Sequence, residues 1–266
     1  LSFYEPEQHI VFNWCEDIPG VPHSEALAAR TLEELQFIYS GATPEVLYSC
    51  WDKQEVKRLL ERAGVPTPLW RIYDSPVIGD WQCFPAIVKP SREHCSYGLT
   101  TDAIVMSKED LKERIAYILD VFRQPAIVED FIDGREFHVS LWGNGSIEML
   151  PPAEMDFTAF DNVRDRLCTF DSKFTPGSAH YVKIGLHLPA LLSEAEYERL
   201  ELTSILAYKT TGCRDYARLD IRLRDGIFYV LDVNPNADIT ADASMACAAE
   251  VAGYSYGEMI SRIVNL

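Results

Sequence analysis

Helical and alternating patterns of apolar residues run along the chain and predict a protein with both helices and strands. Apolar residues at 56, 59, 60 and 63 follow the i, i+3, i+4, i+7 spacing, which predicts an amphipathic helix over residues 52–63 that Gly64 ends. Further helices are predicted over residues 25–36, 108–122, 194–211 and, largely, 241–266. Short apolar runs predict strands at 9–12, 86–88, 126–129 and 136–142. This order of elements favours an α+β protein built in layers around sheets.

Two stretches lack such patterns. Residues 76–84 are expected to form a loop and a domain boundary, and residues 155–189 are expected to form one long loop. A loop that long inside a compact domain is usually functional.

Residues 216–234 predict a hairpin with one charged face. Strict alternation places one set of apolar side chains toward a core: Leu219, Ile221, Leu223, Tyr229, Leu231 and Val233. The other face then gathers Arg218, Asp220, Asp232 and Asn234. If Asp220 lies opposite Asp232, the connection needs either the three-residue loop 225–227 or a bulge, because a two-residue turn would move Asp232 to the apolar face.

The charged face of this hairpin has two interpretations. Two carboxylates and an amide oxygen are ligands that Mg²⁺ prefers, with water and substrate phosphates completing its shell. Alternatively, the face is solvated and holds only an ion pair between an arginine and an aspartate.

Phosphate-binding candidates are single lysines, because the glycine-rich signatures of P-loop and Rossmann proteins are absent from the sequence. Lys53 begins a helix, Lys89 ends a buried strand, and Lys173 lies in the long loop, although an isolated lysine is usually a surface charge. Residues 128–132 are expected either to form ordinary strand core or to present an edge whose backbone reads adenine. Glu136 is a candidate for ribose hydroxyls.

Composition limits the classes of partner. The chain has 266 residues, with 24 Lys and Arg against 41 Asp and Glu, a net charge of −17 that disfavours nucleic acid and anionic membranes. We find no apolar run long enough to span a bilayer. Seven scattered cysteines without a C-x-x-C pair, and a start that does not resemble a signal peptide, favour the cytoplasm. The chain opens on Leu1 rather than Met, and a missing upstream segment is one alternative.

Taken in order, six segments resemble the ATP-grasp superfamily and, within it, the D-alanine–D-alanine ligases. They are Trp51-Asp52-Lys53-x-x-x-Lys57, residues 64–68 (Gly-Val-Pro-Thr-Pro), residues 84–90 (Phe-Pro-Ala-Ile-Val-Lys-Pro), residues 128–137, residues 217–220 (Ala-Arg-Leu-Asp) and residues 231–235 (Leu-Asp-Val-Asn-Pro). The resemblance implies an ATP-grasp fold, in which two α+β subdomains clamp ATP, after a shortened N-terminal α/β unit. We expect the N-terminal unit and linker helix at 1–84, the central subdomain at 85–135 and the C-terminal subdomain at 136–266.

The resemblance also implies roles for individual residues. Lys53 and Lys89 would contact ATP phosphates, and Lys173 would close the long loop onto the γ-phosphate. Adenine would be held by Glu129, Asp130, Phe131 and Ile132, and the ribose by Glu136. Two Mg²⁺ ions, or Mn²⁺ in their place, would be bound by Asp220, Asp232 and Asn234. Arg218 would stabilise the transferred phosphoryl group and the later tetrahedral intermediate.

Departures from the family pattern cluster at amino-acid-binding positions. The usual small-residue loop after the strand-end lysine is bulkier here, with His94, Cys95, Ser96 and Tyr97 as candidate lining of a substrate pocket. A tyrosine of the long loop is replaced by Phe174, a metal-bridging glutamate by Asp232, and a substrate-gripping serine by Ala243. Asp238 stands where the family has a glycine.

The sequence therefore predicts an ATP-dependent ligase that joins a carboxylate to an amine through an acyl phosphate and does not make D-alanyl-D-alanine. The resemblance adds a homodimer as an expectation. The alternatives are a nucleotide-binding protein without ligase activity, or an enzyme that makes a thioester or a phosphoester.

Overall fold

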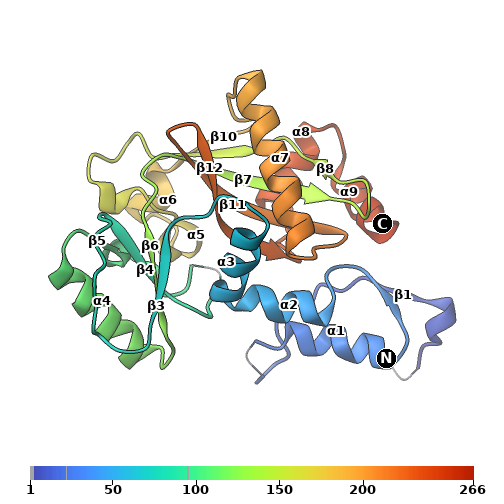
Figure 1. Cartoon of the computed structure of the whole chain (residues 1–266). Helices are drawn as coiled ribbons and strands as arrows, with labels where there is room; N and C mark the ends of the chain where they lie inside the picture. Colours follow the sequence, from blue (N-terminus) through green and yellow to red (C-terminus); the bar gives the residue numbers. More distant parts are fainter. Residues whose placement is uncertain (1–2, 22, 95) are drawn as a thin grey trace.

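The structure, a computed structural model, describes residues 3–21, 23–94 and 96–266. Its N-terminal region contains a short 3-10 helix, η1 (Pro6–Gln8), and a two-stranded parallel sheet of β1 (Ile10–Val11) and β2 (Ile38–Tyr39). Helices α1 (Glu25–Glu34) and α2 (Pro44–Trp51) pack beside this sheet around a small apolar core (Figure 1). Thr43 caps α2 by accepting a hydrogen bond from the Val46 N–H.

A four-stranded antiparallel sheet follows, in the order β3–β6–β4–β5. Its strands are β3 (Trp70–Tyr73), β6 (Ala126–Asp130), β4 (Ala86–Pro90) and β5 (Ile104–Val105). The long helix α4 (Lys108–Val121) covers one face with Leu111, Ile115 and Ile118, all fully buried. The 3-10 helix η2 (Thr101–Ala103) precedes β5. Since β3 pairs with β6, this sheet takes one strand from the predicted unit 1–84; the predicted division into three units stays a prediction.

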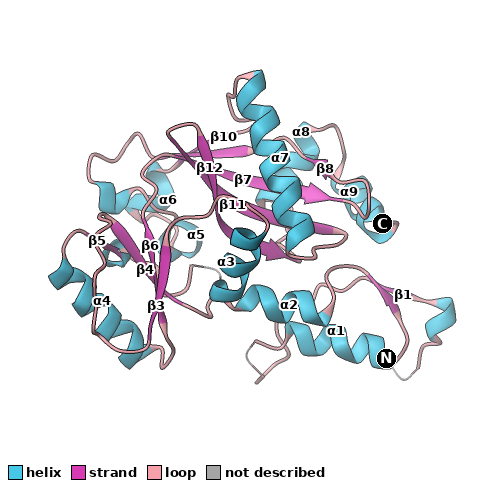
Figure 2. Cartoon of the chain, viewed as in Figure 1, coloured by secondary structure: helices cyan, strands magenta, loops and turns pink. Residues whose placement is uncertain are grey.

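The larger sheet has six strands in the order β10–β9–β7–β11–β12, with β8 also paired to β7. The strands are β7 (Arg135–Trp142), β8 (Glu148–Met149), β9 (Ala153–Asp156), β10 (Gly185–His187), β11 (Tyr216–Arg224) and β12 (Ile227–Pro235). Helices α3 (Lys53–Arg62) and α7 (Glu194–Thr210) contribute to the core on one face (Figure 2). Near Trp142 the other face packs against α8 (Ser244–Val251) and α9 (Tyr256–Val264). Further along β7, that second face carries Glu136 and His138, which line a cavity.

The β11–β12 hairpin confirms one prediction and corrects another. Asp220 lies opposite Asp232, as predicted, and a bulge adjusts the register between Asp220 and Ile221. The connection is the two-residue turn Asp225-Gly226, both residues with positive φ, so the bulge rather than a longer loop restores the phase. Because Leu231 is the extra residue, the residues of β12 that pack on the core are Phe228, Val230 and Val233; the predicted set of Tyr229, Leu231 and Val233 was wrong at its first two members.

The stretch 155–189, predicted to be one long loop, contains short elements. They are the 3-10 helix η3 (Val163–Asp165), helices α5 (Phe170–Phe174) and α6 (Ala179–Lys183) and, at the two ends, parts of the paired strands β9 and β10. Elements of three to five residues are too short to produce a periodic apolar pattern, which is why the sequence did not reveal them. Among the described residues, no helix is long and apolar enough to cross a membrane.

Candidate active site

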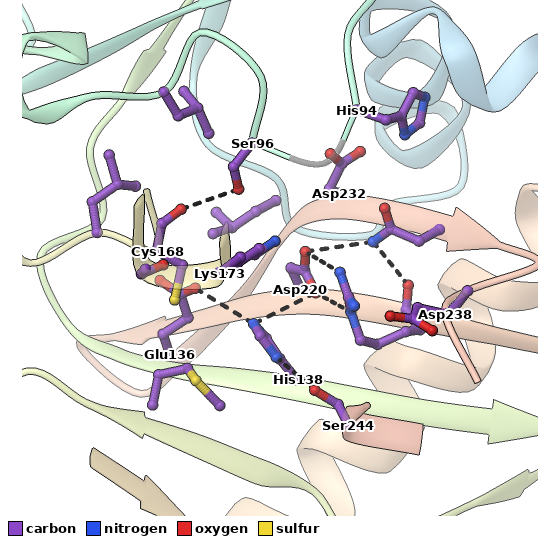
Figure 3. A pocket seen from close by; sticks show the side chains of 18 of the residues that line it. His94, Ser96, Glu136, His138, Cys168, Lys173, Asp220, Asp232, Asp238 and Ser244 are labelled. Carbon is purple, nitrogen blue, oxygen red and sulfur yellow. Dashed lines mark hydrogen bonds and ion pairs between the residues drawn. The ribbon is translucent and has the colours of Figure 1, made fainter. Parts of the chain in front are cut away.

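A cavity of about 610 Å³ lies between the two larger sheets. It is lined from β4 and β6 on one side and from β7, β11 and β12 on the other, with the residues after β4 and the α5–α6 segment at its rim (Figure 3). All predicted site residues whose side chains are described line it: Lys53, Lys89, His94, Ser96, Tyr97, Glu129, Asp130, Phe131, Ile132, Glu136, Lys173, Arg218, Asp220, Asp232, Asn234 and Asp238. Cys95 and the side chain of Phe174 lie outside the described residues. The fold therefore brings together residues that are up to 185 positions apart (238 − 53).

The charged face of the hairpin forms one wall of this cavity. Arg218 donates from Nε to Oδ1 of Asp220 across 2.8 Å, and Nδ2 of Asn234 donates to Oδ2 of Asp220 at 3.4 Å. Burial opposes ionisation of the Asp220 carboxyl, but Arg218 and His138 hold its pKa below the ordinary range, so it is a carboxylate at neutral pH. Two carboxylates and an amide oxygen on adjacent strands fit a divalent cation that prefers oxygen ligands.

Lysines occupy the opposite wall, and each is paired with a carboxylate. Lys53 donates from Nζ to Oδ2 of Asp232 at 2.8 Å. Glu129, 1% exposed, forms ion pairs with Lys89 and with Lys57, whose Nζ lies 2.9 Å from its Oε1. Burial alone would raise the pKa of the Glu129 carboxyl, yet the two ammonium groups lower it below its ordinary value. The cavity thus holds a preformed lattice of alternating buried charges.

Lys57 was part of the sequence motif but received no predicted role. Its ammonium also donates to Thr67 Oγ1 at 2.8 Å and to the backbone carbonyl of Leu231 at 2.9 Å. This single group therefore ties α3, the segment before β3, the bulge of β12 and the carboxylate on β6. The helical spacing from Lys53 to Lys57 places both on one face of α3, a signal that could have suggested a second lysine at the site.

The predicted adenine-reading edge needs a correction. β6 is an interior strand, paired with β3 on one side and β4 on the other, so its ladder groups are already used. The Asp130 and Phe131 N–H groups donate to Leu69 and Pro85 carbonyls at 2.8 and 3.0 Å. In the described part of the chain the Ile132 N–H has no hydrogen-bond partner. Only the end of this strand can offer its backbone to a ligand.

Glu136 lies at the floor of the cavity and is held by an arginine that sequence reasoning assigned no role. Arg222 donates from Nε to Oε2 of Glu136 at 2.6 Å, and both side chains are buried. His138, two residues along β7, is also buried and its Nδ1 lies 3.1 Å from Oγ of Ser244. Burial lowers the pKa of His138 to about 4, so its ring is neutral at pH 7. The period of two that links residues 136 and 138 could have predicted their shared face.

Segments at the rim place the remaining predicted residues. Lys173 lies on α5, which Thr169 caps by accepting from the Ser172 N–H. The Ser96 hydroxyl donates to the Cys168 carbonyl at 3.1 Å and joins the segment after β4 to the residues before α5. His94 lies beside Trp51, and burial lowers the pKa of its ring to about 4.

The opposite end of the cavity is acidic, which the sequence did not reveal. Five carboxylate residues contribute to its lining there: Glu16, Asp17, Glu25, Asp238 and Asp242. Glu16 and Asp17 lie between β1 and α1, Glu25 begins α1, and the other two follow β12. Burial raises the pKa of the Glu25 carboxyl to about 7. Apart from Asp238, their approach depends on tertiary packing and has no local sequence signal.

A family model described as "D-ala D-ala ligase C-terminus" matches residues 75–265, which is most of the chain. The chain belongs to the D-alanine–D-alanine ligase family of ATP-grasp proteins. Membership makes it an ATP-dependent ligase, and its mixed sheets and helices are the ATP-grasp fold.

Individual relatives of this ligase are moderately similar. It is 32% identical to the uncharacterized protein y4sG of Sinorhizobium fredii over 97% of this chain and 74% of that protein. It is 29% identical to a D-alanine–D-alanine ligase of Pseudothermotoga lettingae over 97% of this chain and 81% of that one. The solved D-alanine–D-alanine ligase of Bacillus anthracis, complexed with ATP, has 24% identity and a TM-score of 0.71 over 90% of this chain and 72% of its own. This last similarity supports the fold.

Proposed function

We propose that this ligase joins a carboxylate to an amine through an acyl phosphate, and that its product is not D-alanyl-D-alanine. One observation supports the proposal. At one end of the cavity the charged side chains are paired with one another, and at the other end polar groups expected from the family resemblance are replaced. The paired end holds Arg218, Asp220, Asp232 and Lys53 in direct contacts. At the other end, Ala243 precedes α8 and offers no side-chain cap, where the family resemblance implies a serine that grips a substrate carboxylate.

We assign the nucleotide to the end of the cavity that holds Lys53, Arg218 and the two aspartates. Lys53 and Lys89 bind phosphate oxygens, and Lys173 approaches the γ-phosphate from α5. The Ile132 N–H at the end of β6 binds the adenine edge, beside Glu129, Asp130 and Phe131, and Glu136 binds the ribose. Asp220, Asp232 and Asn234 would hold two Mg²⁺ ions, which would neutralise phosphate charge when bound.

The reaction proceeds in two displacements. A substrate carboxylate oxygen attacks the γ-phosphorus of ATP, the bond to ADP breaks, and an acyl phosphate forms. An amine nitrogen then attacks the acyl carbon, the carbon–oxygen bond to phosphate breaks, and the amine proton passes to solvent. Phosphoryl transfer needs positioning and charge stabilisation more than a covalent protein group. The Arg218 guanidinium, oriented by Asp220 at 2.8 Å, supplies a fixed positive charge where negative charge develops.

The acidic end supports a different substrate from the family's. A pocket that loses a hydrogen-bonding group rejects the ligand that needs it strongly. Carboxylates such as Asp238 and Asp242 also favour a substrate whose amino group lies at this end.

An ADP-release assay tests the proposal. Purified protein with ATP and Mg²⁺ is incubated with a panel of amino acids and dipeptides, D-alanine included, and products are identified by mass. We expect ADP, phosphate and an amide with one member other than D-alanine. Arg218→Ala should abolish the signal, whereas Arg199→Ala, an exposed arginine on α7, should keep it.

D-alanyl-D-alanine as the preferred product would overturn the substrate proposal, and a stable phosphoester or thioester would overturn amide formation. ATP binding without turnover across the panel would favour a nucleotide-binding protein.

We further propose a homodimer in a reducing compartment such as the cytoplasm. The six cysteines that the structure describes are all free thiols, which supports the compartment. Sedimentation of the purified protein tests the dimer.

A further inference from the structure

Three side chains of different chemistry meet on the floor of the cavity. Glu136 and His138 come from β7, and Cys168 precedes α5; one ligand atom of each lies within 4.8 Å of the others (Figure 3). We propose that this cluster, Glu136–His138–Cys168, binds a divalent transition metal of the zinc class. The site shares no ligand with the oxygen-rich positions assigned to Mg²⁺.

Glu136 and His138 are already oriented as ligands. Arg222 holds Oε2 of Glu136 at 2.6 Å, which leaves Oε1 free, and Ser244 holds Nδ1 of His138 at 3.1 Å, which leaves Nε2 free. These two free atoms face each other at 3.8 Å, too far apart for a hydrogen bond. Metal-bound histidines and carboxylates are oriented by such outer partners.

The spacing of the free atoms suits a tetrahedral ion. Zinc binds nitrogen and oxygen at about 2.0–2.2 Å and sulfur at about 2.3 Å, so neighbouring ligand atoms stand roughly 3.3–3.7 Å apart. The 3.8 Å between Nε2 and Oε1 is close to this range, and the Cys168 sulfur, within 4.8 Å of the other ligand atoms, would have to move closer on binding. On binding, the thiol proton leaves to solvent and the sulfur–metal bond takes its place.

The donor set selects the class of metal. A thiolate with an imidazole favours zinc and its chemical neighbours over magnesium or calcium, which take oxygen ligands. Nearby charges are mixed: Asp220 Oδ1 lies 3.9 Å from His138 Nε2, while Arg222 and Lys173 are cationic. Coordination by Glu136 and a thiolate compensates the ion, and the fourth position opens toward the cavity.

Cobalt is the probe, because a cobalt–thiolate bond absorbs in the near ultraviolet. Purified protein without nucleotide is titrated with Co²⁺ and then with Zn²⁺. We expect an absorption band that saturates at one ion per chain and disappears when zinc displaces cobalt. Cys168→Ser should lose the band. Cys247→Ser removes a different cavity-lining thiol and should keep it.

Ser244 contacts His138 but is not itself a proposed ligand, so a substitution there leaves all three ligands in place. Ser244→Ala should weaken cobalt binding by about 10- to 100-fold while the band retains its shape. Circular dichroism shows whether each variant is folded. A band that survives in folded Cys168→Ser, or that disappears in Cys247→Ser, would overturn the assignment.

Competition with ATP adds a readout that rests on the proposed position of the ribose at Glu136. We expect ATP to displace cobalt and Zn²⁺ to weaken ATP binding in calorimetry. A cobalt–thiolate band that ATP leaves unchanged would overturn the ribose position and not the metal site; absence of the band would overturn the metal site and not the ligase.

Discussion

The two ends of the cavity are built in opposite ways. At the phosphate end, charges of both signs alternate at direct contact: Lys57 with Glu129, Lys53 with Asp232, Arg218 with Asp220. At the other end the charges have one sign, and Glu16, Asp242 and Glu25 have no cation paired with them among the described residues. The first arrangement is complete without a ligand, and the second is not.

The difference indicates that the phosphate end positions ATP and that the acidic end recognises the other substrate. A paired lattice holds each donor in place before ATP arrives, so little reorganisation is needed during phosphoryl transfer. An end with uncompensated carboxylates gains electrostatic stabilisation only when a cationic group enters. The common part of the reaction is therefore assigned to the regular strands, and the choice of substrate to the segments around α1 and α8.

Breaking the lattice at its most buried member should have the largest effect. Lys57→Met leaves a charge on Glu129 without one of its two partners, and we expect the free energy of unfolding to fall by about 3–5 kcal/mol. Denaturant titration measures this. Lys112→Met on the exposed side of α4 serves as the control and should change stability little; equal losses would contradict the buried role.

Two conservative carboxylate changes compare the ends directly. Asp232→Asn removes the charge that faces Lys53, and we expect kcat to fall by about 10²–10³. Asp238→Asn keeps the oxygen that accepts from the Thr240 N–H at 2.8 Å, and we expect a higher KM for the amino substrate with kcat retained. Steady-state kinetics with the substrate found in the panel separates the two; a similar loss of kcat in both would remove the distinction.

Glu25 gives a pH-dependent difference. Its pKa is about 7 in the folded protein and 4.5 as a free side chain, so the folded state binds more protons between these values and stability falls as pH rises through them. Glu25→Gln removes this loss and should stabilise the protein at pH 8 by about 3 kcal/mol, with no gain at pH 4. Thermal unfolding at both pH values measures it. Glu34→Gln, exposed on the same helix, should show no such pH dependence.

The smallest effect is expected at the acidic rim. Asp242 is exposed, and Asp242→Asn should change the free energy of unfolding by less than about 0.5 kcal/mol. A large change in the same denaturant titration would mean that this carboxylate is paired, and that the two ends are more alike than the contacts indicate.

How much of this could be predicted depended on whether the signal was local. Strand alternation was enough to place Asp220 opposite Asp232, because one face of the hairpin had to be apolar. It could not place the bulge at Leu231, whose apolar side chain suits either phase. The interior position of β6 also escaped prediction, because β3 is only four residues long and pairs with a strand more than fifty positions away.

Prediction of the candidate-site residues also depended on whether the sequence signal was local. Residues on regular strands, such as Arg218 and Asn234, were predicted from spacing and resemblance together. The acidic residues between β1 and α1 reach the cavity only through packing between distant segments, which no pattern within 14–25 encodes. The contacts of Lys57 likewise depend on three separate parts of the chain.

The extra residue in β12 has a consequence for comparing this chain with others. Before Leu231 the even-numbered residues of β12, Phe228 and Val230, face the core. After it the odd-numbered Val233 does, so the alternation of the strand changes phase at this residue. If Leu231 were paired in the ladder instead of bulged, it would lie opposite Asp220, and Asp232 would slide opposite Leu219 and turn from the ligand-facing side into the apolar core. A relative whose strand lacks the extra residue can therefore be aligned with this chain only by opening a one-residue gap, even where all neighbouring residues are identical.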